Sequence, residues 1–192
     1  MPTRREFLKA GGLMLAGLSI SGTGAAPVAA AETPDVSQAV EIYMKSDRMG
    51  ANVWFDPIGI FIEPGRTIRW VVSENVHTTT AYHPRNANHS LRIPSDAAPW
   101  DSGYLSPGEH YEVRFTVEGV YDYYCMPHEA AGMVGRIVVG KPAGPGALPF
   151  DYFEGKPYAK DWLPVPLAAQ AAFPSVERIM RERVVRLGMK ED

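Results

Sequence analysis

Residues 123–135 read YYCMPHEAAGMVG and bring three types of metal-binding donor into one short segment. Cys125 offers a thiolate, His128 an imidazole and Met133 a thioether. Sulfur donors combined with imidazole suit copper, and an electron-transfer copper site uses two His, one Cys and a weak axial Met. Cys125 is the only cysteine in the chain, so an internal disulfide cannot account for it. The segment therefore predicts a copper site that takes one further His from elsewhere in the chain.

The pattern of this segment, Tyr-Cys-x-x-His-x-x-x-x-Met-x-Gly, resembles the copper-binding loop of the cupredoxins and has the spacing of plastocyanins. The segments 100–103 (WDSG), 106–109 (SPGE) and 117–121 (VEGVY) extend the likeness, which covers about residues 40–140. The resemblance implies an all-β fold, a Greek-key β-sandwich or barrel, that holds one type 1 copper ion. The ligands that it implies are His77, Cys125, His128 and Met133.

The second imidazole must come from His77, His83 or His89, and the periodicity of the sequence does not choose among them. His77 follows the segment WVVSENV, which resembles the cupredoxin stretch that carries the first copper-binding His. The resemblance therefore favours His77, with His83 as the next candidate. His83 and His89 lie in a polar loop and are expected on the surface. His110, at the entry of a predicted strand, is also expected to be exposed.

Neighbours of the ligands are expected to tune the site, because hydrogen bonds to a metal ligand change its donor strength. Asn75 and Thr78 flank His77 and are candidates by position. Many plastocyanins have Asn directly after this His, whereas this chain has Thr78, which leaves the reduction potential open. The resemblance places the electron port at the exposed edge of His128. Tyr124 either offers a second route through the neighbouring cysteine or simply packs.

Short apolar stretches separated by Pro and Gly turns predict a sandwich or barrel of strands. Residues 40–45 alternate between apolar and polar side chains, which is the period of a half-buried strand. Further strands are expected at 53–55, 58–62, 67–72, 111–117, 121–125 and 134–139. A plain soluble β-sandwich is the simpler interpretation of the same pattern.

The first 31 residues are interpreted as an export signal and not as part of the fold. Arg4 and Arg5 precede the apolar run 10–20, which is too short for a permanent membrane-spanning helix. Residues 29–31 (AAA) offer the small side chains that a signal peptidase needs. The paired arginines resemble a twin-arginine signal, which implies export to the periplasm or the extracellular face, with no permanent membrane span after cleavage. An uncleaved N-terminal anchor is the alternative.

The charge balance points away from nucleic acid. The chain has 19 basic and 22 acidic residues and a net charge of -3, without the basic stripe of a nucleic-acid binder. Residues 32–140 hold 14 acidic and 8 basic residues. We therefore expect this domain to react faster with a basic redox partner, such as a cationic cytochrome, at low salt. Alternatively, the acidic side chains are only a solvated face.

After Gly140 the composition changes and the cupredoxin resemblance ends. Residues 141–166 are rich in Pro and Gly and predict an extended tail or wrap. A helix is expected from Ser175, which would cap it, to Gly188, which would end it. We expect this helix to dock on the protein's own barrel away from His128, with a partner or a membrane surface as alternatives. Its apolar face would consist of Val176, Ile179, Met180, Val184 and Leu187.

The chain is thus expected to contain a signal (1–31), a cupredoxin domain (32–140) and an extension (141–192). Two imidazoles, a thiolate and a thioether leave no open position for a substrate, whereas catalytic metal sites keep one. We expect an electron carrier that cycles one copper ion between Cu(I) and Cu(II), and not an enzyme. Expected partners are redox proteins such as a cytochrome or a membrane or periplasmic reductase or oxidase. Alternatives are a copper storage or delivery module, an electron-donating subunit of a copper-containing respiratory complex, and a copper enzyme.

Overall fold

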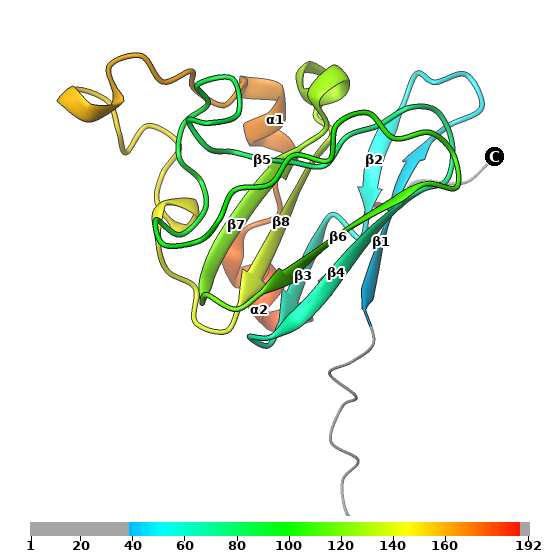
Figure 1. Cartoon of the computed structure of the whole chain (residues 1–192), viewed down its shortest axis with the longest axis horizontal. Helices are drawn as coiled ribbons and strands as arrows, with labels where there is room; N and C mark the ends of the chain where they lie inside the picture. Colours follow the sequence, from blue (N-terminus) through cyan, green and yellow to red (C-terminus); the bar gives the residue numbers. More distant parts are fainter. Residues whose placement is uncertain (1–38, 189–192) are drawn as a thin grey trace, which may run out of the picture. The chain divides into compact units, whose positions relative to one another are not determined.

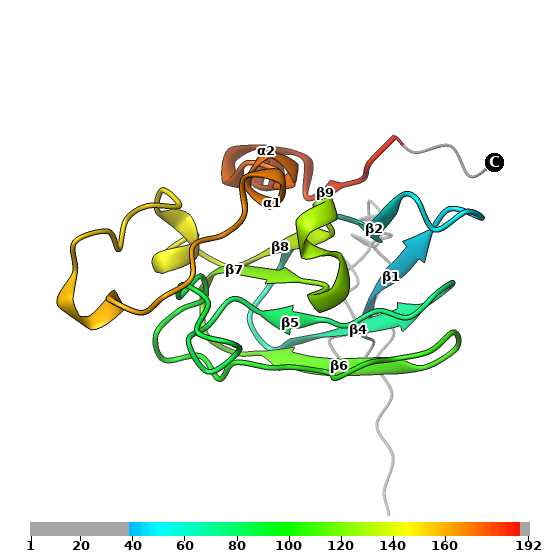
Figure 2. The ribbon, with the colours of Figure 1, turned by 90° about the horizontal axis from the view of Figure 1, so that it is seen from above.

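Two β-sheets lie face to face in the computed structural model, which describes residues 39–188 (Figures 1 and 2). The first sheet has the order β2-β1-β4-β6 and consists of β1 (Val40–Ser46), β2 (Val53–Asp56), β4 (Arg66–Val72) and β6 (His110–Phe115). The second has the order β5-β7-β8-β3-β9 and consists of β3 (Gly59–Ile62), β5 (Thr80–Ala81), β7 (Gly119–Tyr124), β8 (Val134–Val139) and β9 (Val184–Val185). The expected all-β sandwich is confirmed. The expected export signal lies outside the described residues.

Both sheets mix parallel and antiparallel pairs. Strand β1 runs parallel to β4, and β3 runs parallel to β8, while the other neighbours are antiparallel. Strands β7 and β8 pair along their whole length, with Tyr124 opposite Val134 at one end. The segment that joins this end of β7 to β8 carries Cys125, His128 and Met133.

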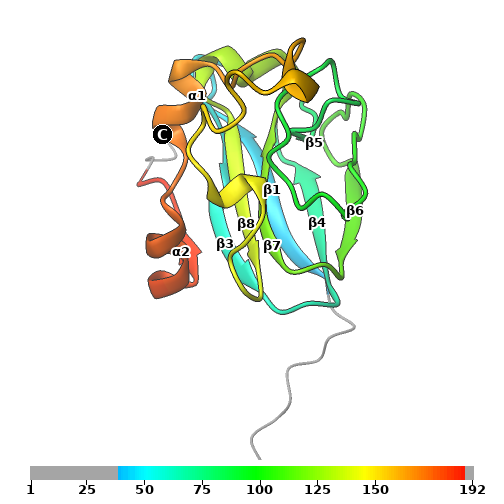
Figure 3. The ribbon, with the colours of Figure 1, turned by 90° about the vertical axis from the view of Figure 1, so that its left-hand side faces the viewer.

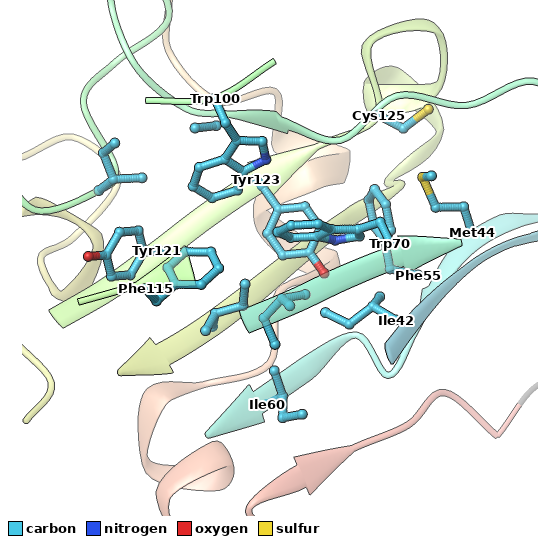
Figure 4. Packing of buried hydrophobic residues seen from close by; sticks show 14 of the residues in the cluster. Ile42, Met44, Phe55, Ile60, Trp70, Trp100, Phe115, Tyr121, Tyr123 and Cys125 are labelled. Atoms are coloured by element: carbon cyan, nitrogen blue, oxygen red, sulfur yellow. The ribbon is translucent and has the colours of Figure 1, made fainter. Parts of the chain in front are cut away.

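The core between the sheets follows the alternation seen in the sequence. Ile42 and Met44 of β1 are fully buried, as the period of two predicts. Deeper in the core, the rings of Trp70 and Tyr123 meet edge to face with their centroids 5.4 Å apart. Figure 4 shows Cys125 at the edge of these packed rings, and Cys125 belongs to the same buried cluster. The thiol is therefore positioned by the packed core.

Every residue of β7 and β8 is buried, because the extension covers the outer face of their sheet. Helices α1 (Leu167–Ala172) and α2 (Val176–Glu182) lie against this face (Figure 3). Ile179 of α2 and Val185 of β9 form one buried cluster with Val120 of β7 and Val138 of β8. The extension therefore docks on the protein's own sheet, as expected.

Buried charges tie the extension to the sheet. The carboxylate of Asp122 on β7 lies 3.1 Å from Arg92 Nε and 2.7 Å from Arg136 Nε. Arg92 also donates to three carbonyl groups within residues 146–149, and Arg136 donates to the carbonyl of Pro174 at 2.9 Å. We call Arg92, Asp122 and Arg136 the Asp122 cluster. It fixes residues 146–149 and Pro174 on the sheet. The segment 141–166 includes two short 3-10 helices, η2 (Pro145–Ala147) and η3 (Pro157–Ala159).

The predicted C-terminal helix begins correctly but ends early. The Ser175 side chain caps α2 by accepting a hydrogen bond from the Arg178 backbone N–H at 3.1 Å. The helix stops at Glu182, because the backbone of Arg183 turns to φ 65° and the following residues pair with β3 instead. The expectation that Val184 and Leu187 lie on the helix face is therefore wrong, and both side chains are exposed. Strand β3 gains a partner along an edge that would otherwise be unpaired.

Helix α1 was not predicted, and it packs beside the segment that carries His128. A Cβ atom placed on Gly132 would lie 3.5 Å from both Ala168 O and Ala172 Cβ of this helix. Figure 2 shows α1, in orange, next to the 3-10 helix η1 (Met126–Ala131), in light green. The helix expected from Ser175 is α2, which lies on β3 and β8 as its expected position away from His128 requires, whereas the unpredicted α1 contacts η1. Among the helices of residues 39–188, none combines the length and the apolar character that crossing a bilayer requires.

Candidate metal centre

Three of the four predicted donors meet at one end of the core. The ligand atoms of His77, Cys125 and His128 all lie within 4.8 Å of one another. The Sγ atom of Cys125 is 3.6 Å from His77 Nδ1 and 3.3 Å from His128 Nδ1. His77 comes from the loop between β4 and β5, Cys125 directly follows β7, and His128 lies in η1. Two nitrogen atoms and one sulfur atom from separate parts of the chain thus converge.

Backbone hydrogen bonds fix the segment between Cys125 and Met133, which we call the ligand loop. The N–H of His128 donates to the carbonyl of Cys125 at 3.0 Å, and the N–H of Met133 donates to the carbonyl of His128 at 3.1 Å. The N–H of Cys125 in turn donates to the carbonyl of Met133 at 3.0 Å, which closes the loop. Gly132 ends η1 with φ 84°, a conformation that glycine adopts without strain. Met133 is thereby held in the core with its side chain fully buried.

His77, and neither His83 nor His89, lies next to Cys125. Its backbone is held by a pair of hydrogen bonds with Leu105, at 3.1 and 2.9 Å. His83 is half-buried, and its Nδ1 accepts the backbone N–H of Arg85 at 3.0 Å. The sequence left the choice among three histidines open, and the geometry supports the one that the resemblance favoured. His110 is exposed at the start of β6, as expected.

The expectation that His89 is a surface residue is wrong. Its side chain is buried, with its ring 4.7 Å from that of Tyr124 and 5.3 Å from that of Tyr82. Its Nε2 faces the carboxylate of Glu129 at 3.6 Å. The polar loop around His89 folds inward, because the backbone of Asn88 accepts a hydrogen bond from the N–H of Leu163 in the extension at 2.7 Å.

Burial keeps the three donors neutral in the metal-free protein. It raises the pKa of the Cys125 thiol to about 11, against the smaller opposite effect of a hydrogen bond from Thr78. It also lowers the pKa of His77 to about 4, helped by the nearby His128, and lowers the pKa of His128. Neutral imidazoles are ready to coordinate, and a metal ion must displace the thiol proton. The chemistry of the set therefore fits a thiophilic cation that accepts imidazole, such as copper.

Thr78 connects the two ligand-bearing segments. Its backbone N–H points at Cys125 Sγ at 3.3 Å, and its hydroxyl accepts the backbone N–H of Met126 at 2.8 Å. Such contacts hold a ligand sulfur in place and lower its charge density. Asn75, the other candidate by position, uses its side chain to accept the N–H of Val76 within its own loop. Of the two flanking candidates, Thr78 is the one that contacts the site.

Only one of the four predicted ligand side chains reaches the surface. His77, Cys125 and Met133 are fully buried, whereas His128 is half-buried. Pro127 and Ala131, which stand on either side of His128 in η1, are exposed. The edge of the His128 ring is therefore the part of the centre that is closest to solvent.

Tyr124 does not reach the surface. Its side chain is 1% exposed and packs in one cluster with Tyr82, Val165 and Ala169. The extension thus closes the side of the strand on which Tyr124 lies. This position agrees with the alternative that Tyr124 is a packing residue and not a second electron route.

Sequence reasoning missed Tyr82 and Glu129, which adjoin the centre. The Tyr82 hydroxyl donates to the Glu129 carboxylate at 2.6 Å. The two residues are far apart in the sequence, so no local pattern could have paired them. The position of Glu129 directly after His128 was the one available signal.

Comparison with known sequences gives a family match that covers the sandwich and the ligand loop. The family model described as copper binding proteins, plastocyanin/azurin family, matches residues 40–140. A plastocyanin of Chlamydomonas reinhardtii is 39% identical over 90 residues, which cover 44% of this chain and 57% of that protein. A pseudoazurin of Methylorubrum extorquens is 28% identical over 109 residues, covering 56% of this chain and 66% of that protein. The chain spans little more than half the length of the first curated relatives it matches.

A solved structure gives the same result for the fold. The structure of a pseudoazurin from Sinorhizobium is similar with a TM-score of 0.51 and 26% identity. The match covers 74% of this chain and 93% of that pseudoazurin. The likeness therefore extends over nearly the whole of the smaller protein.

Proposed function

Because this chain belongs to the plastocyanin/azurin family of copper binding proteins, we propose that it carries single electrons between exported redox proteins. The proposed ligands of its one copper ion are His77, Cys125, His128 and Met133. The observation that carries the proposal is the buried group of two imidazoles and one thiol, of which only the His128 ring approaches the surface.

Each proposed ligand has a role that follows from its donor atom. Cys125 supplies the thiolate, and His77 and His128 complete the plane of strong donors. Met133 supplies a weak thioether donor that adjusts the reduction potential. When bound, copper supplies a one-electron Cu(I)/Cu(II) couple. Because the protein holds the donors before the metal arrives, little ligand movement is needed when the charge of the ion changes.

Burial of the donors favours a carrier over an enzyme. A catalytic metal site keeps one position open for water or substrate. Here four donors of this chain would fill the positions around the ion, and the half-buried His128 ring is the route by which an electron would leave. A copper enzyme normally uses a second copper centre. Within residues 39–188, one group of three or more His, Cys, Asp or Glu side chains has the spacing of a metal site.

Copper storage or delivery is the second candidate. A delivery protein needs ligands that exchange easily, often on a flexible or exposed segment. His77 is fully buried and held by two backbone hydrogen bonds, which argues for slow exchange. A role as an electron-donating subunit of a copper-containing respiratory complex would use the same centre and the same His128 edge.

The proposed location is the periplasm or the extracellular face. Residues 1–31 carry the expected twin-arginine signal, residues 32–140 the copper domain and residues 141–192 the extension. We propose a cytochrome or a membrane or periplasmic reductase or oxidase as the redox partner. N-terminal sequencing of the exported protein tests the signal, because cleavage after Ala31 leaves Glu32 as the first residue. An intact N-terminus would indicate an anchor instead.

The experiment that tests the function combines electron exchange with metal retention. Copper-loaded protein is reduced chemically, mixed with an oxidised cationic cytochrome in a stopped-flow instrument, and then exposed to a weak copper chelator. We expect rapid one-electron transfer, slower at high salt because charge steering acts over about 8 Å at physiological ionic strength, and retention of copper. Rapid loss of copper to the chelator without electron transfer would favour storage or delivery.

A further inference from the structure

One side chain outside the metal centre contacts the chain neighbours of two proposed ligands. Tyr82 is fully buried directly after the short strand β5. Its hydroxyl donates to the carboxylate of Glu129, the residue after His128, at 2.6 Å. Its ring packs on that of Tyr124, the residue before Cys125, with centroids 4.5 Å apart. Tyr82 therefore contacts both ends of the segment that carries Cys125 and His128.

We propose that Tyr82 is a positioning residue that fixes His128 relative to Cys125 through Glu129 and Tyr124. This inference rests on the proposed copper site. The Glu129 side chain is 13% exposed, so its carboxylate is held away from most of the solvent. A nearly buried carboxylate needs hydrogen-bond donors. The Tyr82 hydroxyl is such a donor, and the buried ring of Tyr82 holds it in place. Loss of this donor frees Glu129 to turn outward and releases η1 next to His128.

Tyr82 can act as a fixed point because its own surroundings are packed. It belongs to a buried cluster with Val134 at the start of β8 and with Val165 and Ala169 of the extension. Its ring also lies 6.1 Å from that of Phe173. Functional side chains keep their geometry best when rigid elements support them. The extension supplies part of that support through Val165, Ala169 and Phe173, so these residues contribute to the geometry of the metal centre.

His89 completes the arrangement around Glu129. Its Nε2 lies 3.6 Å from the second carboxylate oxygen, and its ring packs on Tyr124. Tyr82 and His89 thus each contact one oxygen of the Glu129 carboxylate. The ligand loop is held in this way by side chains as well as by its own backbone hydrogen bonds.

The test compares Tyr82→Phe with Tyr121→Phe. Both variants remove one hydroxyl from a buried tyrosine, and the Tyr121 hydroxyl donates to the carbonyl of Val117 at 2.7 Å, away from the ligand loop. The first readout uses metal-free protein, in which the rate of Cys125 alkylation by iodoacetamide reports opening of the loop. Rates are corrected for the measured change in the free energy of unfolding. We expect faster alkylation for Tyr82→Phe and a rate like that of the wild type for Tyr121→Phe.

The second readout uses copper-loaded protein. Residues that support a metal ligand from outside typically contribute 10–100-fold to affinity, so Tyr82→Phe is expected to lower copper affinity about tenfold. We also expect its reduction potential and charge-transfer band to shift. Tyr121→Phe is expected to change none of these, although it lowers stability. A lack of the band in the wild type would contradict the proposed function, and the alkylation rates would still decide the role of Tyr82.

Variants of Glu129 test the same Tyr82–Glu129 hydrogen bond by changing its acceptor. Glu129→Gln keeps an oxygen acceptor for the Tyr82 hydroxyl, whereas Glu129→Leu has none. We expect Glu129→Gln to stay closer to the wild type in alkylation rate, and the double variant Tyr82→Phe/Glu129→Leu to be no worse than its worse single variant. Additive effects, or equal behaviour of Tyr82→Phe and Tyr121→Phe in every readout, would show that Tyr82 only packs.

Discussion

Strand β7 adjoins two buried polar clusters that differ in how completely their atoms are paired. On its outer face, Asp122 pairs with Arg92 and Arg136, and both guanidinium groups also donate to carbonyl groups of the extension. At its end, His77 Nδ1 and His128 Nδ1 converge on Cys125 Sγ at 3.6 and 3.3 Å, and these three atoms are the donors that a metal ion would use. The first cluster is a completed structural contact. The second keeps donor atoms available, which is what a metal site requires.

The two clusters also differ in charge. Asp122 is the shared counter-charge of Arg92 and Arg136, so its removal leaves two buried guanidinium groups without compensation. The donors of the metal centre are neutral, because burial raises the pKa of Cys125 and lowers that of His77. A neutral cluster tolerates removal of a member far better than a charged one. Substitutions in the two clusters should therefore separate loss of function from loss of stability.

The largest effect on function is expected for His77→Ala. The variant should fold, because it removes a neutral side chain, but it should lack the intense charge-transfer absorption of a copper thiolate centre. The control is His83→Ala, which should keep the absorption, since His83 lies apart from Cys125. Visible spectra of the two copper-titrated variants make the comparison. The reverse result would mean that His83 is the ligand.

The largest effect on stability is expected for Asp122→Asn. This change keeps the shape of the side chain but leaves two buried guanidinium groups without their counter-charge, which should cost about 3–5 kcal/mol. Chemical denaturation of the metal-free protein measures this loss of unfolding free energy. The control is Glu112→Gln, which breaks an exposed pair with Arg69 and should cost less than about 1 kcal/mol. Similar values for the two would contradict the structural role of the Asp122 cluster.

A smaller loss of stability is expected where α2 docks. Ile179→Ala removes a fully buried side chain from the cluster on β7 and β8 and should lower the free energy of unfolding by about 2–5 kcal/mol. Val184→Ala changes an exposed apolar side chain in the same part of the chain and should have an effect within about 0.5 kcal/mol. The visible spectra of both copper-loaded variants should match the spectrum of the wild type. A small effect of Ile179→Ala would indicate that α2 detaches in solution.

The smallest effect is expected for Met133→Leu. The variant keeps a buried apolar side chain but lacks the weak axial donor, which stabilises Cu(II), so copper should remain bound and the reduction potential should rise. Cyclic voltammetry measures the shift. An unchanged potential would show that Met133 is only a core residue. Met126→Leu is the control, because the exposed Met126 side chain lies outside the centre and should leave the potential as it is.

Features set by local pattern were predicted from the sequence. The alternation in β1 and the apolar run of β8 follow from side-chain periodicity, and the ligand loop follows from the spacing of Cys125, His128 and Met133. Ser175 was recognised as a helix cap, because capping depends on a few adjacent residues. These predictions needed no knowledge of which segments pair.

Features set by long-range contacts were not predicted. The predicted helix ends at Glu182 because the following residues complete the edge of β3, a distant strand. Helix α1 has a short sequence of Ala-rich composition with one fully buried residue, Ala169, so it carries almost no periodic signal. His89 is buried because a segment of the extension pairs with its loop. Such contacts depend on the folded topology and not on neighbouring residues.

The most direct test of the central claim is a titration of the metal-free protein with Cu(II), followed by visible absorption, in the wild type and in Cys125→Ser. We predict an intense thiolate-to-copper charge-transfer band in the wild type that saturates at one ion per chain and disappears on one-electron reduction. The folded Cys125→Ser variant should show no such band and should bind copper more weakly. The same band in Cys125→Ser, or no band in the wild type, would contradict the assignment of Cys125 as the copper ligand.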